Sequence, residues 1–322
     1  MSSIEKAIER LIARQKKDGA SQSLGKVEDN DKTSEMAGMS AVEESTVSTA
    51  VVPDKIAEKY DDEITESRKI VADKKGDLSE KRICNLDFKR LDKSGFLVPE
   101  TSHLRLAEEY RVIKRPILKN AFNKGAVPVD KGNLVMVTSS IEGEGKTYTA
   151  LNLAMSIAME LDCTILLVDA DFTMRSLTKT LGLETETGLV DILHDKKRDM
   201  GDSILATNID RLKILPAGRK TRNPTELLAS SRMAMITEEL SRRYPDRIIL
   251  FDTPPVLAAT ETASIMHHMG QVIVVVESSR TPTDVIKSCI AHIDDDKVIG
   301  MVLNKSRFHG KTGYYGGYGP VE

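Results

Sequence analysis

Six runs of β-type apolar residues recur along the second two-thirds of the chain, separated by polar turns and segments of helical spacing. They occupy residues 134–137, 164–171, 211–218, 246–255, 271–278 and 297–305. Near-continuous Val, Ile and Leu in a strand indicate burial on both faces, which is typical of a parallel sheet covered by crossover helices. The pattern therefore predicts an α/β fold with a functional site at the carboxyl ends of the strands.

The N-terminal part of the chain has a different pattern. We assign residues 1–18 to an amphipathic helix whose apolar face carries Ile4, Ala7, Ile8, Leu11 and Ile12. This helix either packs on its own domain or docks on a partner or membrane surface, and the sequence leaves both open. Residues 19–95 are polar and highly charged, which predicts a disordered linker. Order is expected from near Phe96, with the main domain at 96–308 and a Gly- and Tyr-rich tail at 309–322.

Composition excludes several classes of function. The formal net charge of −3 gives no reason to expect nucleic acid as a partner. No apolar run approaches the ~20 residues that would span a bilayer. The six histidines show no metal-ligand spacing, and the three cysteines form no CxxC pair. Reduced thiols in a cytoplasmic protein fit this cysteine usage.

The stretch VMVTSSIEGEGKTYTALNLAM, which begins at Val135, has the order of a phosphate-binding loop: strand, glycine turn, GKT, then helix. It predicts a P-loop NTPase-type domain. Ser140 stands where the first glycine of GxxxxGK(S/T) is expected. Lys146 is expected to reach the β- and γ-phosphates of ATP, and the Thr147 hydroxyl to bind Mg²⁺. The predicted ATP-binding residues are Ser140, Glu142, Gly143, Glu144, Gly145, Lys146, Thr147 and Tyr148.

Three aspartates follow apolar strands. Asp169 and Asp171 end one run, and Asp252 ends another. In a parallel sheet these ends share an edge with the phosphate loop, so all three carboxylates can face one Mg-nucleotide. Asp252, after the apolar IILF, suits the Walker B role at the metal. A single aspartate after a strand is also a common turn residue. Three on one predicted edge favour a nucleotide site.

The C-terminus concentrates tyrosine. Tyr314, Tyr315 and Tyr318 are three of the seven tyrosines, and they stand among glycines in the last nine residues. Glycine-rich chain presents phenols on a flexible tether, which extends up to ~35 Å between Asn304 and Tyr314 at ~3.5 Å per residue. Alone, such a tail is read as low-complexity sequence. Beside a phosphoryl-transfer site, substrate tyrosines are the favoured interpretation.

A helix is predicted over residues 103–122, with a kink or interruption near Pro116. Glu108, Arg111 and Lys114 recur every three residues on it and could pair across a subunit boundary. The alternative is a solvated charged face.

Together these motifs resemble the bacterial tyrosine autokinases of exopolysaccharide export, most closely the exosortase-associated branch, over roughly residues 100–322. TSSIEGEGKT resembles the family's Walker A, although Glu142 replaces a frequent proline. LLVDADFTMR and IILFDTPP resemble its two further Walker motifs, and PAGRKTRNPTELL and the tail GYYGGYGP are similar to other family segments. EEYRVIK resembles the ring-forming ExxRxxR motif, with Lys114 replacing the second arginine; this swap loses bidentate pairing.

The resemblance implies ATP-dependent autophosphorylation of the tail tyrosines, in trans within a ring. It implies Asp171 as general base, Asp169 and Thr147 at Mg²⁺, and Lys146 at the transferring phosphoryl group. The catalytic set is then Lys146, Asp169, Asp171 and Asp252, and the metal set Thr147, Asp169 and Asp252. A separate membrane polysaccharide co-polymerase is the implied activator, which would place this protein in the cytoplasm, peripherally at the inner membrane.

Two rival functions remain. A partition or division-site ATPase of the same fold acts as a dimerisation switch, but it carries a lysine early in the loop, where this chain has Ile141. A non-catalytic nucleotide-binding adaptor of an export complex would carry the same site. The sequence does not exclude the adaptor.

Overall fold

The computed structural model describes residues 82–100, 103–125, 127–244 and 246–306, all within one unit that spans Glu80–Glu322. The predicted helix at 1–18, most of the linker and the tyrosine tail lie outside the described residues. The eight strands of the described part are β1 (Ile83–Cys84), β2 (Leu134–Ser139), β3 (Thr164–Asp169), β4 (Leu205–Thr207), β5 (Leu212–Leu215), β6 (Arg247–Asp252), β7 (Gln271–Glu277) and β8 (Val298–Asn304).

These strands form one sheet in the order β1-β4-β5-β3-β6-β2-β7-β8. Every neighbouring pair is parallel except β4 and β5, which run antiparallel. The all-parallel expectation is therefore corrected at this one pair, while the predicted fold class is confirmed for the described residues. The register places Asp169 of β3 opposite Asp252 of β6, and Asp252 opposite Val137 of β2. The carboxyl ends of the central strands thus meet at the phosphate loop.

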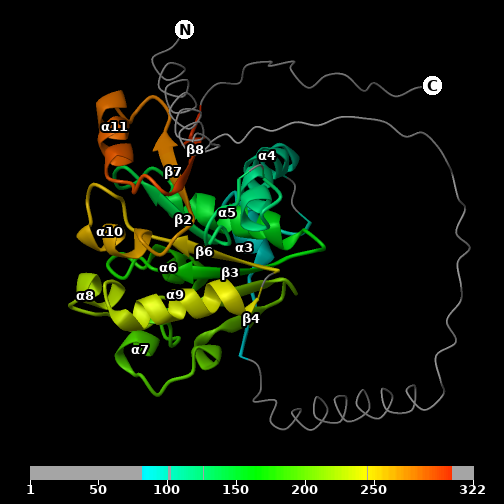
Figure 1. The fold of residues 1–322 in the computed structure, drawn as a ribbon. Coiled ribbons are helices and arrows are strands. Elements are labelled where there is room, and N and C mark those ends of the chain that lie inside the picture. Colours follow the sequence, from blue (N-terminus) through cyan, green and yellow to red (C-terminus); the bar gives the residue numbers. More distant parts are fainter. Residues whose placement is uncertain (1–81, 101–102, 126, 245, 307–322) are drawn as a thin grey trace, which may run out of the picture. The chain divides into compact units, whose positions relative to one another are not determined.

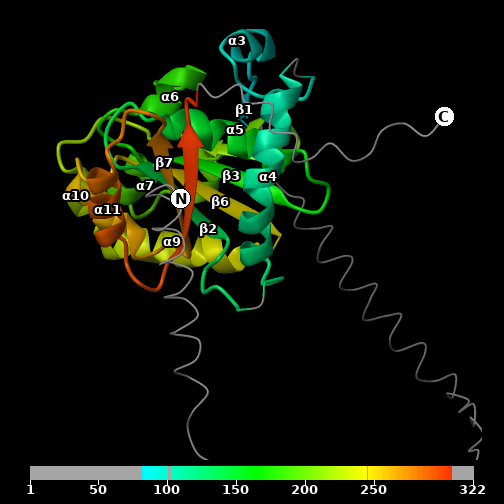
Figure 2. The same cartoon turned by 90° about the horizontal axis from the view of Figure 1, so that it is seen from above.

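Helices cover both faces of the sheet (Figures 1 and 2). One apolar cluster joins a sheet face to the C-terminal helices, and the other cluster joins the opposite face to α3, α4, α5 and α6. The central strands β2, β3, β6 and β7 are therefore buried on both faces, which explains their unbroken apolar runs, whereas the edge strand β8 is partly exposed. The helices are α3 (Phe88–Lys93), α4 (Leu104–Ala121), α5 (Lys146–Ala158), α6 (Ser176–Leu181), α7 (Leu189–His194), η1 (Met200–Ser203), α8 (Pro224–Leu228), α9 (Ser231–Arg243), α10 (Thr260–Met266) and α11 (Thr283–Ala291).

Ordered structure begins before Phe96, earlier than the charge pattern predicted. β1 pairs with β4, and Leu86 and Leu91 are buried in the cluster around α5. The Leu97 amide donates to Asn152 Oδ1 of α5 at 2.7 Å. A few apolar residues in a charged segment are enough to order it when they pack against a neighbouring helix, as Leu86 and Leu91 do in the cluster around α5.

The predicted interruption near Pro116 does not occur, since α4 continues through this residue to Ala121. Proline removes one backbone donor, and tertiary packing of the buried Tyr110 and Ile117 holds the helix on α5. Within the described residues, no helix is both long enough and apolar enough to cross a bilayer.

Candidate active site

The phosphate loop connects β2 to α5 through two glycines in the left-handed region. Gly143 has φ of +85° and Gly145, the residue before α5, has φ of +97°. A side chain at Gly145 would also collide with Asn304, because an added Cβ would lie 2.1 Å from its Nδ2 atom. Backbone strain and close contact both restrict this position to glycine.

Four consecutive backbone amides of the loop are left without an acceptor in the part of the chain that the structure describes. Among the described residues, the N–H groups of 142–145 donate to no protein acceptor. Left-handed and right-handed residues in succession turn such amides into one concavity, and the N-terminus of α5 adds its dipole. Unused donors in this arrangement fit the phosphates of a nucleotide.

Glu144 is fully buried in the loop, and its carboxylate braces the backbone. One oxygen accepts from the Ile141 amide at 2.8 Å; the other accepts from the Glu277 amide at 3.2 Å and from the Thr281 hydroxyl. The sequence placed Glu144 among the phosphate-binding residues. In the structure its side chain instead ties the loop to the end of β7, while its backbone N–H stays available to an anion.

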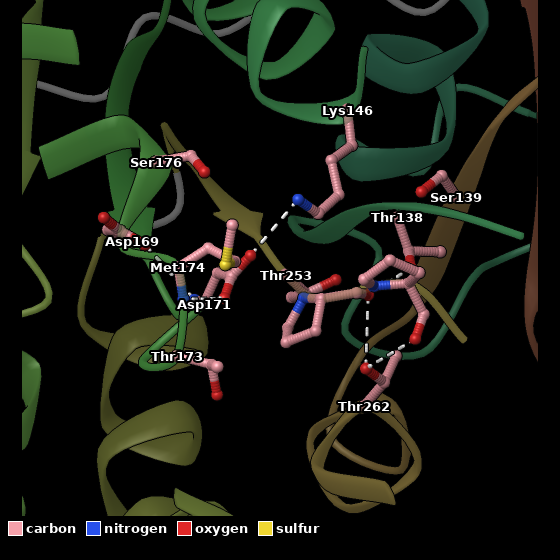
Figure 3. A network of polar contacts seen from close by, with 12 residues as sticks. Thr138, Ser139, Lys146, Asp169, Asp171, Thr173, Met174, Ser176, Thr253 and Thr262 are labelled. Carbon is pink, nitrogen blue, oxygen red and sulfur yellow. Dashed lines mark hydrogen bonds and ion pairs between the residues drawn. The ribbon is translucent and has the colours of Figure 1, made fainter. Parts of the chain in front are cut away.

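Lys146 and Asp171 face each other above the loop. Lys146 Nζ lies 3.1 Å from Asp171 Oδ2, and both side chains are nearly inaccessible to solvent (Figure 3). The other Asp171 oxygen accepts from the Met174 amide at 2.9 Å, which fixes the carboxylate. A carboxylate held beside the loop lysine is placed to accept a proton from a hydroxyl that attacks a bound phosphate.

Asp252 is fully buried at the end of β6, and neither carboxylate oxygen has a hydrogen-bond partner in the described part of the chain. Burial raises the pKa of Asp252 to about 8, against the lowering effects of Lys146 and of the Thr147 hydroxyl. Two unpaired carboxylate oxygens close to a threonine hydroxyl fit a hydrated Mg²⁺ ion. The described residues hold no group of three or more His, Cys, Asp or Glu that could form an all-protein metal site.

Asp169 is placed differently from the sequence expectation. One of its oxygens accepts from the Thr178 amide and hydroxyl at 2.8 and 2.6 Å, and the other accepts from the Asp171 amide at 3.2 Å. Its carboxylate points away from Lys146 (Figure 3). Burial raises the pKa of Asp169 to about 6, although the bonds from Thr178 lower it. This geometry does not support direct metal binding by Asp169. The Asp169 side chain instead connects the end of β3 to α6 through its hydrogen bonds with Thr178.

The remaining predicted loop residues divide into exposed and structural ones. Glu142 is exposed, whereas Ser140 is buried. Tyr148 donates its hydroxyl to Gly95 O at 2.7 Å, and its ring lies 5.1 Å from that of Phe96. Tyr148 therefore fastens the segment before α4 to the start of α5, and its side chain does not serve as a phosphate ligand in this geometry.

The three predicted oligomerisation residues lie in different environments on α4. Glu108 and Arg111 form an exposed ion pair with each other on α4. Lys114 is 5% exposed, donates to Ser156 O at 2.7 Å and pairs with Glu160 at 2.6 Å. Its ammonium thus caps the C-terminal end of α5 within the same chain, so it does not provide the exposed partner that the ExxRxxR resemblance suggested.

Sequence reasoning missed the contribution of the chain after β7 and β8. Glu277, Asn304 and Lys305 all contact the loop or one another at the sheet edge. The Asn304 Nδ2 atom donates to Glu144 O at 2.9 Å. The available signal was the polar pair Asn304-Lys305 at the end of an apolar run in the sequence.

The fold and the loop define a P-loop nucleotide-binding protein, and comparisons with known proteins agree. A family model described as an AAA domain matches residues 133–299. Tyrosine-protein kinase YwqD of Bacillus subtilis (strain 168) is 30% identical over 233 residues, which cover 70% of this chain and 93% of that protein. Tyrosine-protein kinase wzc of Salmonella typhi is 32% identical over 192 residues, but these cover 58% of this chain and only 26% of that protein.

The kinase domain of the Escherichia coli tyrosine kinase ETK has the same fold, with a TM-score of 0.55 and 23% identity over 75% of this chain and 90% of that domain. The chain therefore belongs to the bacterial tyrosine-protein kinase family. This confirms the predicted enzyme class, a transferase with a P-loop nucleotide site. Assignment to the exosortase-associated branch stays a prediction.

Proposed function

We propose that this protein is an ATP-dependent tyrosine autokinase that phosphorylates Tyr314, Tyr315 and Tyr318 of its own tail, in trans within a homo-oligomer. The observation that carries the proposal is the Lys146–Asp171 pair, 3.1 Å apart beside four unused loop amides. This arrangement supplies a cation for the transferring phosphoryl group and a proton acceptor for the attacking group at one place.

The transfer step uses both members of the pair. The tyrosine hydroxyl oxygen forms a bond to the γ-phosphorus of ATP, the bond from that phosphorus to the bridging oxygen breaks, and ADP leaves with both bonding electrons. The phenol proton passes to the Asp171 carboxylate, which the Met174 amide holds in place. Lys146 moves from Asp171 to the charged phosphate oxygens, which frees the base when nucleotide enters.

Thr147 and Asp252 would hold Mg²⁺, whose charge, when bound, screens the phosphates and supports the leaving group. The two unpaired Asp252 oxygens are the feature that supports this assignment. Asp169 keeps a positioning role, because its bonds to Thr178 and to the Asp171 amide orient the segment that carries the base.

The position of the tail root supports tail tyrosines as substrates. Lys305, nine residues before Tyr314, donates to Gly143 O of the loop at 2.7 Å. Nine extended residues reach ~30 Å, so the phenols have access to nucleotide sites close to that root. This length allows both cis and trans transfer, and the family resemblance favours trans.

Partners and location follow from the same resemblance. We infer a separate membrane polysaccharide co-polymerase as activator, a role in exopolysaccharide synthesis or export, and a cytoplasmic protein held peripherally at the inner membrane. Residues 1–15, or alternatively the edge of the kinase domain, are the proposed docking element, and residues 309–322 are the proposed substrate tail. Deletion of residues 1–15 separates the two alternatives, because membrane recruitment is lost only if the N-terminal helix is the docking element.

The decisive experiment is mass spectrometry of the C-terminal peptide after full-length protein is incubated with Mg-ATP. We expect phosphate on at least one tail tyrosine in the wild type and none in Lys146→Met or in the Tyr314/Tyr315/Tyr318→Phe variant. In Asp171→Asn, loss of the general base should slow transfer by about 10²- to 10⁴-fold. ATP hydrolysis without phosphotyrosine would support the dimerisation switch, and nucleotide binding with neither activity would support the adaptor.

A further inference from the structure

Residues at the carboxyl ends of β7 and β8 form hydrogen bonds to the backbone carbonyls of the phosphate loop. Asn304 Nδ2 donates to Glu144 O at 2.9 Å, and Lys305 Nζ donates to Gly143 O at 2.7 Å. The same ammonium lies 3.1 Å from Glu277 Oε2, an oxygen that also pairs with Arg280 at 2.8 Å. Glu277 and Asn304 end β7 and β8, Arg280 and Lys305 come shortly after them, and both strands lie on the same side of β2, where the loop begins.

The contacts act on the peptide units that present the loop amides. In a trans peptide unit, C=O and N–H point in opposite directions, and the described residues contain no cis peptide bond. Fixing the carbonyls of Gly143 and Glu144 from β8 therefore turns the N–H groups of Glu144 and Gly145 to the other side. Those two amides belong to the set without a protein acceptor.

Lys305 is built into this position. Its φ of +55° lies in the left-handed region, which is uncommon for a residue with a side chain. Lys305 and Arg280 both lower the pKa of Glu277, so this carboxylate stays ionised and keeps the ammonium beside the loop. Lys305 therefore combines three features: an unfavourable backbone conformation, an ion pair with Glu277 and a hydrogen bond to the Gly143 carbonyl.

We propose that Lys305, at the root of the tail, is a positioning residue for the nucleotide: through Gly143 O it orients the loop amides toward the phosphates. Lys305 also brings a positive charge close to the phosphate site. The inference rests on the proposed nucleotide site, and it makes loop geometry depend on the chain segment from which the substrate tyrosines extend.

The test measures affinity for Mg-ADP by isothermal titration calorimetry on full-length protein, which requires no phosphotransfer. Lys305→Met keeps the aliphatic stem and removes the donor and charge, and we expect affinity to fall by about 3- to 10-fold. Lys305→Arg, which keeps charge and donors, should recover most of the affinity. The matched control is Lys287→Met, an exposed lysine of α11 outside these contacts.

Thermal unfolding separates positioning from folding. Because the Lys305 side chain is 46% exposed, the midpoint of Lys305→Met should stay close to that of wild type while affinity falls. Equal affinity of wild type and Lys305→Met would overturn the inference alone, as would an equal loss in Lys287→Met. A wild-type chain that binds no Mg-ADP would overturn the proposed function and this inference together.

Discussion

At the scale of single residues, the three aspartates show what a motif predicts and what it omits. Their positions after β3 and β6 follow from parallel strands that end at one edge, and the register of Asp169 opposite Asp252 agrees with this prediction. The direction of each carboxylate does not follow, because it depends on neighbours distant in sequence. Thr178 takes Asp169 out of the site, whereas Asp252 is left without a protein partner.

The unpaired Asp252 carboxyl predicts a pH-dependent stability of nucleotide-free protein. Its pKa rises from 3.8 to about 8 on folding, so the folded state binds this proton more tightly than the unfolded chain. The contribution is fully present below the unfolded pKa and is lost as pH rises through the folded pKa. Asp252→Asn removes this loss, because the amide stays neutral.

We therefore expect Asp252→Asn and wild type to have similar stability only below the unfolded pKa of 3.8. The advantage of the variant should grow steadily as pH rises from there to about 8, and reach a few kcal/mol near pH 9. Urea unfolding across this range, without Mg²⁺ or nucleotide, measures the difference. Asp87→Asn at the exposed N-cap of α3, where the amide oxygen can still accept from the Arg90 N–H, is the comparison variant. A constant difference between wild type and Asp252→Asn across the range would contradict the raised pKa.

At the scale of elements, long buried strands were predictable and short ones were not. β2, β3, β6 and β7 are continuous apolar runs, because helices cover both of their faces. β1 has two residues and β4 has three, too few for any period to be visible. The antiparallel pairing of β4 with β5 depends on the connection between them, Asn208 to Arg211, rather than on the composition of either strand.

The helix α4 allows a test that separates folding from assembly. Lys114→Ala removes the donor that satisfies Ser156 O at the end of α5 and leaves a buried carbonyl unpaired, which should cost about 1–3 kcal/mol of unfolding free energy. Arg111→Ala breaks only an exposed pair and should cost about 0.5 kcal/mol or less. If α4 mediates assembly, Arg111→Ala lowers the oligomer fraction without loss of stability.

Urea denaturation and sedimentation velocity, run on the same preparations, distinguish the two effects. A stable Lys114→Ala variant with an unchanged unfolding midpoint would contradict the capping role of Lys114. Unchanged assembly of Arg111→Ala would remove this face of α4 from the subunit contact.

At the scale of the whole molecule, the proposal requires one chain's tail to reach another chain's site. The contact of Lys305 with Gly143 places the tail root beside a nucleotide site of its own chain. Proximity alone would favour transfer within a chain, and only an oligomer brings a second site within the ~30 Å reach of the tether. The route of transfer is therefore a property of assembly and not of the isolated fold.

Mixing two chains, neither of which can phosphorylate its own tail, distinguishes transfer within a chain from transfer between chains. The donor chain keeps its site but has Tyr314, Tyr315 and Tyr318 changed to Phe, and the acceptor chain keeps its tyrosines but carries Lys146→Met. Transfer in trans predicts phosphotyrosine on the acceptor in the mixture, at a rate that rises with total protein concentration, because encounter or assembly precedes chemistry. If transfer occurs within one chain, the mixture stays unphosphorylated although wild type reacts. The rate of wild-type phosphorylation is then independent of protein concentration.

Adding Arg111→Ala to both chains should slow the trans reaction if α4 supports the oligomer, while leaving the Mg-ADP affinity of each chain unchanged.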